Sequence, residues 1–568
     1  MNYPNKMKRF ITKTKHIVIT ILLTISLTFF TAFNDVDFEI IKNLDIYYTL
    51  FKELNSYYVD NINPGELVKK SIDDMLESLD PYTNYIPESR IEDYQFMTTG
   101  QYGGVGASVV RKDGKIIITD VYENAPAQKA GLRAGDIVIA IDNHQTEGKT
   151  TEQISEYMKG QPGTFAELTI KRPTANGLKD TVISIGRDKI TIGNVPYYGM
   201  VSDSVGYIVL SQFTEESAAH IQDALKELKE KNNAKSLILD LRFNPGGLLI
   251  EAVDIVNLFV KRGQEVVSTR GKSSQWNKSF KARNTPFDLD IPIVVMINSG
   301  SASASEIVSG ALQDLDRAVV LGQRSFGKGL VQITRDLTYN CKLKVTTAKY
   351  YIPSGRCIQA LDYSHRNPDG SVGHIPDSLI SKFKTLNGRT VYDGGGVIPD
   401  LVTETNAPSK ITSALFQQYL IFDFATQYIL KHQTIDSPKK YKFSETDWNS
   451  FVSYIKEQKF DYKTTSAESL DKLIEVAKEE KYYDKSEQEF NALKSKLAAD
   501  KEKDLVLFKD EIVKYLQDEI VARYYFQKGR IESSLANDTD IRKAVSMLSE
   551  KDLTTYKSIL NGTYKEKK

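Results

Sequence analysis

The strongest constraint on the fold is an alternation of short apolar runs and amphipathic stretches between residues 187 and 401. The runs are rich in β-branched residues and end at turn residues, as buried strands do. Residues 214–228 place apolar side chains at helical spacing between two of these runs. Such alternation predicts an α/β core in which helices cover a sheet. The expected strands are 205–210, 236–241, 293–297, 318–322, one near Gln332 and 343–351.

A serine cluster follows the expected strand 293–297. Residues 299–306 read Ser-Gly-Ser-Ala-Ser-Ala-Ser-Glu, and the apolar spacing that follows predicts a helix beginning near Ser303. A hydroxyl at a helix start is held on a tight turn, and the unpaired N–H groups around Ala304 can stabilise an oxyanion. The residues alone do not choose among Ser301, Ser303 and Ser305 as nucleophile. The same cluster is also typical of a small-residue helix packing surface.

A serine nucleophile requires a base within hydrogen-bond reach, and Lys328 is the best-placed candidate. None of the six histidines stands in an obvious triad motif, whereas Gly327 and Gly329 let the backbone at Lys328 pass closely. Burial would lower the pKa of this lysine and make neutral amine available near pH 7. A strand over 328–333 would place Lys328 and Gln332 on one face, so that Gln332 orients the amine. The alternative is a solvated lysine in a glycine turn.

A second glycine turn follows the expected strand 236–241. Residues 242–247 read Arg-Phe-Asn-Pro-Gly-Gly, and their backbone amides are little covered by side chains. Such amides form concavities that hold anions. Pro-Gly-Gly alone is typical of an ordinary turn. Together with a nucleophilic serine it becomes a candidate for the second half of an oxyanion hole.

These stretches together resemble the carboxyl-terminal processing peptidases, also called tail-specific proteases, over roughly residues 40–401. The resemblance implies a serine peptidase with a ClpP/crotonase-like α/β core and Ser303 as nucleophile, chosen by the family's 25-residue interval to the lysine. It also implies Lys328 as general base, Gln332 as its orienting partner, and the amides of Ala304 and of Gly246 or Gly247 as the oxyanion hole. The matching segments are 240–247, 300–306, 313–314, 327–329 with Gln332, 350–355 and 395–400.

Residues 84–186 resemble a PDZ domain. Gly103, Gly104, Val105 and Gly106 would form its carboxylate-binding loop, and residues 125–136 its helix-turn-strand passage. Successive loop amides can hold a terminal carboxylate while an extended peptide adds to a sheet edge. We therefore expect protein or peptide substrates with apolar C-termini. The glycine pair taken alone would indicate no more than a hairpin.

The remaining segments complete a multidomain α+β chain. Residues 1–33 carry basic residues before an apolar stretch, which indicates a signal peptide or an uncleaved membrane anchor and hence export to the periplasm or the outer face of the inner membrane. Residues 34–83 form an N-terminal helical region that pairs subunits in the family, so we expect a homodimer. Within the core of 187–401, residues 361–390 form a surface insertion. Residues 402–568 form a charged C-terminal helical domain, a scaffold that is also a candidate for dimerisation or adaptor docking.

Composition excludes several other functions. Lysine plus arginine equals aspartate plus glutamate at 74 each, so no basic footprint for nucleic acid is present. No zinc motif, phosphate-binding loop or dinucleotide fingerprint occurs, so no metal or cofactor is implied. Cys341 and Cys357 would pair only in an oxidising compartment. Two alternatives stay open, namely a catalytically silent PDZ-containing binding or scaffold protein on the same fold, and an enzyme held inactive until the PDZ domain moves.

Overall fold

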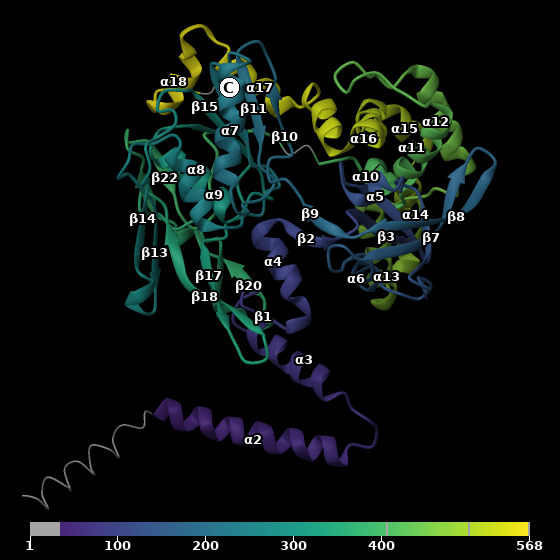
Figure 1. Cartoon of the computed structure of the whole chain (residues 1–568), viewed down its shortest axis with the longest axis horizontal. Coiled ribbons are helices and arrows are strands. Elements are labelled where there is room, and N and C mark those ends of the chain that lie inside the picture. The colour runs from purple at the N-terminus through teal and green to yellow at the C-terminus, as the bar shows by residue number, and fades with distance from the viewer. Residues whose placement is uncertain (1–34, 405–406, 498–499, 566–568) are drawn as a thin grey trace, which may run out of the picture. The chain divides into compact units, whose positions relative to one another are not determined.

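The computed structural model describes residues 35–404, 407–497 and 500–565 (Figure 1). The chain divides into two compact units, residues 1–85 and 86–568. The expected signal peptide or anchor, residues 1–33, lies outside the described residues. Among the helices that are described, none combines the length and the apolar character needed to cross a membrane.

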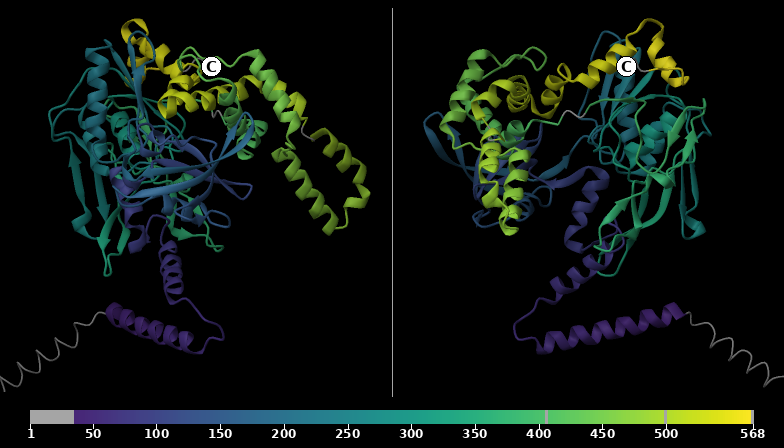
Figure 2. Two further views of the ribbon diagram at one scale, coloured as in Figure 1. Left: turned by 45° about the vertical axis from the view of Figure 1, so that its right-hand side comes forward. Right: turned by 180° about the vertical axis from the view of Figure 1, so that it is seen from behind.

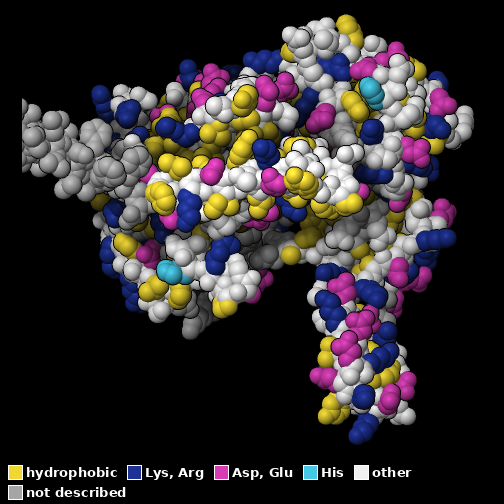
Figure 3. Space-filling model, turned by 90° about the horizontal axis from the view of Figure 1, so that it is seen from below, with side chains coloured by type: hydrophobic (Ala, Val, Ile, Leu, Met, Phe, Trp, Pro, Cys, Tyr) yellow, Lys and Arg dark blue, Asp and Glu magenta, His cyan; other side chains and the backbone are white. Residues whose placement is uncertain are grey.

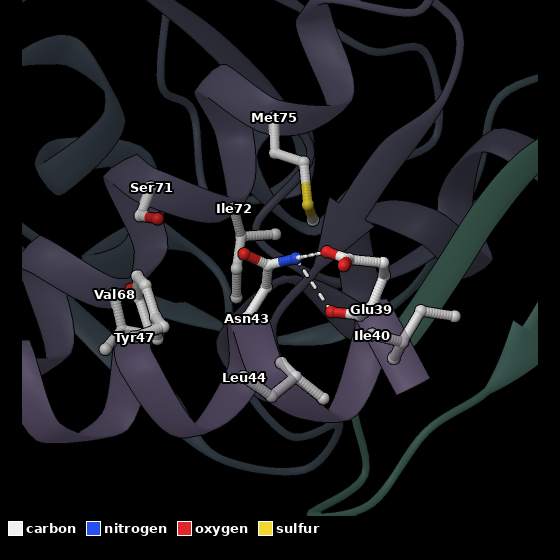
Figure 4. A pocket seen from close by; sticks show the side chains of 9 residues that line it. All are labelled: Glu39, Ile40, Asn43, Leu44, Tyr47, Val68, Ser71, Ile72 and Met75. Atoms are coloured by element: carbon white, nitrogen blue, oxygen red, sulfur yellow. Dashed lines mark hydrogen bonds between the residues drawn. The ribbon is translucent and has the colours of Figure 1, made fainter. Parts of the chain in front are cut away.

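The first unit consists of two helices, α2 (Asp35–Tyr57) and α3 (Pro64–Glu77), followed by the start of β1 (Asn84–Ile86). Asn63 caps α3 by accepting the N–H of Gly65 at 3.1 Å, and a proline opens the helix. Large apolar side chains of α2 stay exposed, and they gather on the face shown in Figure 3, over the helix next to the grey residues. Between the helices lies a cavity of about 800 Å³, into which Leu44 and Ile72 point (Figure 4).

The segment that resembles a PDZ domain is a small antiparallel sheet with short helices. The sheet order is β3-β4-β5-β7-β8, with β6 beside β5, while β2 and β9 pair as a separate ribbon. Its apolar core is lined by alternate residues of these strands, as expected for strands with one buried face. The elements are η1 (Glu88–Arg90), α4 (Ile91–Thr99), β2 (Gln101–Gly104), β3 (Ala107–Lys112), β4 (Lys115–Val121), α5 (Pro126–Lys129), β5 (Ile137–Ile141), β6 (His144–Gln145), α6 (Thr151–Met158), β7 (Phe165–Thr174), β8 (Gly177–Gly186) and β9 (Asp188–Thr191).

The α/β core is built on a six-stranded sheet of order β10-β11-β12-β15-β16-β23, parallel except for β10 at one edge. A second, antiparallel sheet contains β17, β18, β13 and β14. The elements are β10 (Tyr197–Met200), β11 (Val205–Val209), α7 (Ser217–Glu230), β12 (Ser236–Asp240), α8 (Leu249–Asn257), β13 (Glu265–Gly271), η2 (Ser274–Trp276), β14 (Lys278–Lys281), β15 (Ile293–Ile297), α9 (Ala304–Asp314), β16 (Val319–Gly322), β17 (Leu330–Asp336), β18 (Lys342–Tyr351) and β23 (Leu401–Val402).

Helices cover both faces of the six-stranded sheet. One face packs on α7, α8 and α9, and residues from β13 and β18 of the second sheet join the same apolar cluster. The other face packs on α17 (Thr539–Leu548) and α18 (Thr554–Leu560). The last part of the C-terminal helical domain therefore contributes directly to the core around the sheet. Strands buried on both faces read as continuous apolar runs, as the β12 and β15 sequences do.

The expected insertion at 361–390 consists of two short ribbons, the first largely exposed. They are formed by β19 (Leu361–Arg366) with β20 (Val372–His374), and, after η3 (Asp377–Leu379), by β21 (Lys382–Lys384) with β22 (Thr390–Tyr392). The second ribbon is anchored rather than merely superficial, because Arg389 forms buried ion pairs with Asp316, at 2.6 Å, and with Asp400.

Among the remaining helices, α10, α11, α12, α15 and α16 pack around a further apolar cluster. Lys112 of the PDZ domain forms an ion pair with Asp423 of this helical domain. Helices α13 and α14 form a hairpin that is seen at the edge of the domain in Figure 2. The helices are α10 (Lys410–Gln417), α11 (Leu420–Lys431), α12 (Glu445–Glu457), α13 (Thr465–Glu479), α14 (Glu487–Leu497), α15 (Lys501–Leu507) and α16 (Lys509–Leu535), with short turns η4 (Tyr483–Lys485) and η5 (Lys551–Leu553).

Candidate active site

The serine cluster forms the turn between β15 and α9, as the spacing predicts. Ser303 immediately precedes α9 and has φ 55° and ψ −113°, a conformation that few residues other than glycine adopt. Such backbone costs about 1 to 3 kcal/mol and persists where the surroundings hold it. Here the Ser303 N–H donates to Glu306 Oε2 at 2.8 Å. The turn thus has the strained geometry typical of a nucleophile.

The three candidate serines differ in their surroundings. Ser301 and Ser305 are fully buried, and their hydroxyls donate to backbone carbonyls, of Leu241 at 2.8 Å and of Asn244 at 2.9 Å respectively. Ser303 retains partial exposure. Burial and hydrogen bonding therefore give the outer two serines a structural role and leave the middle one accessible.

The glycine turn after β12 packs directly on the serine turn. A Cβ added at Gly246, where φ is +99°, would lie 2.7 Å from the Ala302 carbonyl oxygen and 2.9 Å from the Ala304 nitrogen. A Cβ at Gly247 would lie 2.1 Å from the Phe213 carbonyl oxygen. Only glycine allows this approach, so the contact between the turns requires glycine at both positions.

The amides at this contact are not equivalent. The Gly246 N–H donates to the side-chain oxygen of Asn244 at 2.9 Å. Within the described part of the chain, the amides of Gly247 and Ala304 have no protein acceptor. Asn244 also joins the turns through its backbone carbonyl, which accepts the Ala302 N–H at 3.0 Å.

The loop of residues 327–329, called the lysine loop below, departs from the geometry expected from the sequence. The strand expected at 328–333 begins only at Leu330, and its pairing with β18 shifts register between Val331 and Gln332. Lys328 therefore lies in a loop and does not share a strand face with Gln332, so that expectation was wrong. The cause is close packing of the flanking glycines: a Cβ at Gly327 would lie 2.4 Å from the Ala360 Cβ.

Glu306 connects the serine turn and the lysine loop. It is fully buried, and its Oε2 accepts the N–H of Lys328 at 2.9 Å as well as that of Ser303. Its Oε1 accepts the Ser325 hydroxyl at 2.5 Å and the Gly327 N–H at 2.7 Å. Burial raises the pKa of Glu306 to about 7, against the lowering effect of these hydrogen bonds.

The role of Glu306 was not predicted, although the residue closes the serine motif. The signal that points to it is Ser303-Ala-Ser-Glu306, the S-x-x-E spacing in which a glutamate reaches back to the N-cap amide. Nothing in that local spacing indicates its second partner, the lysine loop.

Gln332 lies on β17, and its side-chain nitrogen donates to the Thr346 hydroxyl at 3.0 Å.

Other matching motifs form a buried polar network under α9. Asp314 pairs with Arg356 at 2.9 Å and accepts the Ser354 N–H at 3.0 Å. These contacts join the segments 313–314 and 350–356. The role of these two family motifs is therefore structural.

The PDZ domain has a groove of about 240 Å³, lined among others by Ala107 and Val109 of β3, Met158 of α6 and Tyr102. Gly103 and Gly104 lie in β2, paired with β9. The carbonyls of Val105 and Gly106 accept the N–H groups of Ala127, at 2.8 Å, and Tyr122, at 3.0 Å. The Gly106 amide has no protein acceptor within the residues described.

The two cysteines, Cys341 and Cys357, are not joined in a disulfide bond. Burial raises the pKa of the Cys357 thiol.

Comparison with known families identifies three segments. Residues 204–369 match peptidase family S41, residues 117–172 match a PDZ domain, and residues 411–548 match a segment described as "Probable PDZ-protease, C-terminal helical domain". The chain is 39% identical over 323 residues to a carboxy-terminal-processing protease of Bartonella bacilliformis, covering 56% of this chain and 73% of that protein. It is 34% identical to a probable CtpA-like serine protease of Staphylococcus haemolyticus, covering 60% of this chain and 67% of that protein.

This chain is similar to solved structures that include a photosystem II D1 C-terminal processing protease. That protease is 26% identical with a TM-score of 0.35, and the match covers 63% of this chain and 92% of that one. A PDZ domain of a carboxy-terminal protease from Vibrio cholerae, in complex with peptide, is 26% identical with a TM-score of 0.15, covering 16% of this chain and 99% of that one. The multidomain α+β fold, the serine-peptidase activity and the family expected from the sequence are confirmed. The chain belongs to the carboxy-terminal-processing proteases of peptidase family S41, with a PDZ domain and a C-terminal helical domain.

Proposed function

We propose that the chain is an exported endopeptidase in which Ser303 is the nucleophile and Lys328 the general base. The observation that carries this proposal is the position of Glu306, whose single oxygen Oε2 accepts the backbone N–H of both residues, at 2.8 and 2.9 Å. Two residues 25 positions apart are thereby neighbours. The burial of Ser301 and Ser305 supports the choice of Ser303.

In the proposed mechanism, Ser303 Oγ attacks the scissile carbonyl as Lys328 takes its proton. The amides of Gly247 and Ala304, which have no protein acceptor in the described structure, would bind the oxyanion. Gly246 would support them by keeping the two turns in contact. Lys328 then returns the proton to the leaving amine, and water hydrolyses the acyl-enzyme. Gln332 would orient the lysine amine, and its bond to Thr346 would restrict the Gln332 amide.

The PDZ groove supports recognition of substrates by an apolar C-terminus. Its wall is largely apolar, and the amide of Gly106 could bind a carboxylate in the loop that Gly103, Gly104 and Val105 complete. This arrangement would hold one end of a protein while another segment reaches Ser303.

Pairing of two chains, adaptor docking and export stay predictions. The exposed apolar face of α2 supports pairing in a homodimer, which light scattering on the purified chain would decide. The basic leader before an apolar stretch supports export, which cell fractionation would test. An adaptor on the C-terminal helical domain could be sought by crosslinking in cells.

The experiment that tests the nucleophile is covalent labelling of the full chain with a fluorophosphonate, followed by peptide mapping. We expect the adduct on Ser303 alone, because the hydroxyls of Ser301 and Ser305 are buried and donate to backbone carbonyls. Labelling should slow strongly in Lys328→Ala, since the base activates the hydroxyl. An adduct on a different serine would contradict the assignment.

Peptide binding tests the PDZ site separately from catalysis. We expect the Ser303→Ala chain to bind a peptide with a free apolar C-terminus, and amidation of that terminus to weaken binding by more than about tenfold. Charge-assisted hydrogen bonds contribute about 1.5 to 3 kcal/mol, and 1.4 kcal/mol corresponds to a factor of ten. Calorimetry would measure both affinities. Equal affinity for the acid and the amide would mean that another surface selects substrates.

A further inference from the structure

The backbone of the lysine loop is held at every polar group. The N–H groups of Gly327 and Lys328 donate to Glu306, and that of Gly329 donates to the Gln359 side chain at 2.7 Å. The carbonyls of Gly327 and Gly329 accept the N–H groups of Ala360 and Tyr350, both at 2.9 Å. The remaining group is the carbonyl of Lys328 itself.

That last carbonyl is bound by the hydroxyl of Tyr350, at 2.7 Å. The same hydroxyl lies 3.1 Å from the carbonyl oxygen of Ser303. A phenol carries one proton, so the two carbonyls share it, with the shorter contact to Lys328 the stronger. Tyr350 stands near the end of β18 with its side chain buried, and it belongs to a motif that shares in the family resemblance without an assigned role.

The two bridges are complementary. Glu306 accepts the N–H groups of Ser303 and Lys328, whereas Tyr350 donates to their carbonyls. Each bridging residue comes from a different element, α9 or β18, and each is buried. The backbones of the two proposed catalytic residues are therefore connected on both the donor and the acceptor side.

We propose that Tyr350 is a positioning residue for the Ser303–Lys328 pair, holding the two backbones at the separation that proton transfer requires. The inference rests on the proposed function of that pair. Lysine has a flexible four-carbon stem, so its backbone must be placed accurately for the amine to meet the serine hydroxyl. A misplacement of about 1 Å can cost about 100-fold in rate. A tyrosine ring has few rotatable bonds and is packed in the core, so its hydroxyl is a rigid spacer.

The test is Tyr350→Phe in the full chain, which removes the hydroxyl and keeps the ring that fills the core. We expect kcat for an unfolded protein substrate to fall about 10- to 100-fold with KM nearly unchanged. The rate of fluorophosphonate labelling at Ser303 should fall by a similar factor. Binding of the C-terminal peptide to the PDZ domain should stay the same, because that groove is not altered.

The matched control is Tyr556→Phe. Tyr556 is also buried, and its hydroxyl accepts the Ile293 N–H at 3.0 Å in the cluster that contains α17 and α18. This variant should lose comparable stability in thermal unfolding and keep its labelling rate. If Tyr350→Phe labels and cleaves as fast as Tyr556→Phe, the positioning role is overturned. It is also overturned if Tyr350→Phe is inactive only because it is unfolded at the assay temperature.

Ser303→Ala and Lys328→Ala, assayed in the same series, separate this inference from the function on which it rests. If either retains turnover, the proposed catalytic pair fails. If both are inactive while Tyr350→Phe matches its control, only the positioning role fails.

Discussion

Replacement of either Ser303 or Lys328 by alanine is expected to abolish turnover, with a loss in kcat of about 10³- to 10⁶-fold. The serine hydroxyl is a weak nucleophile without a base, and a lysine without its serine has nothing to activate. Because the two act as one unit, the double variant should be no worse than either single variant. Digestion of an unfolded model protein, quantified by mass spectrometry, would measure the residual rate.

Two neighbouring residues provide controls for this prediction. Ser309 lies in α9 and donates its hydroxyl to the Ser305 carbonyl at 2.8 Å, and Lys349 is exposed on β18 opposite Leu330. Ser309→Ala and Lys349→Ala should keep activity, and all four single variants should unfold cooperatively near the wild-type temperature. Cleavage near the wild-type rate by folded Ser303→Ala or Lys328→Ala would refute the assigned pair.

The second large effect is expected at Gly246. Alanine there would place a Cβ 2.7 Å from the Ala302 carbonyl oxygen and 2.8 Å from the Ser303 Cβ, so the glycine turn and the serine turn must separate. Separation would move the Gly247 amide away from the proposed oxyanion position. Loss of one oxyanion donor costs about 10²- to 10³-fold in kcat, and we expect a fall of that order. Steady-state kinetics on the full chain would measure it.

Gly263→Ala is the control for the backbone effect. Gly263 also has a left-handed φ, +88°, but a Cβ there meets no atom within 4 Å. Both variants should lose about 1 to 2 kcal/mol of stability through the left-handed conformation, and only Gly246→Ala should lose activity. If Gly246→Ala retains wild-type kcat, the contact between the two turns is not required for catalysis.

Local sequence determined much of the core. The strands β12 and β15 and the start of α9 lie where apolar runs and helical spacing predict them, because strand burial and helix periodicity depend on neighbouring residues. The glycine turn at 242–247 was predicted for the same reason, since a left-handed backbone requires particular residue types. The family motifs then indicated Ser303 and Lys328, which local spacing alone left open.

Tertiary structure decided how those residues meet. Burial of Ser301 and Ser305 depends on Leu241 and Asn244, about 60 positions earlier, and no local pattern contains that contact. The start of β17 at Leu330 was mispredicted because Ala360 and Gln359 hold the preceding glycines in a loop.

The bridges from Glu306 and Tyr350 were also invisible in the sequence, as was the packing of α17 and α18 on the sheet. A spacing rule reports which residues share a helix face or a strand face. A hydrogen bond between residues 22 or 47 positions apart depends instead on how separate elements pack, and only the folded chain determines that.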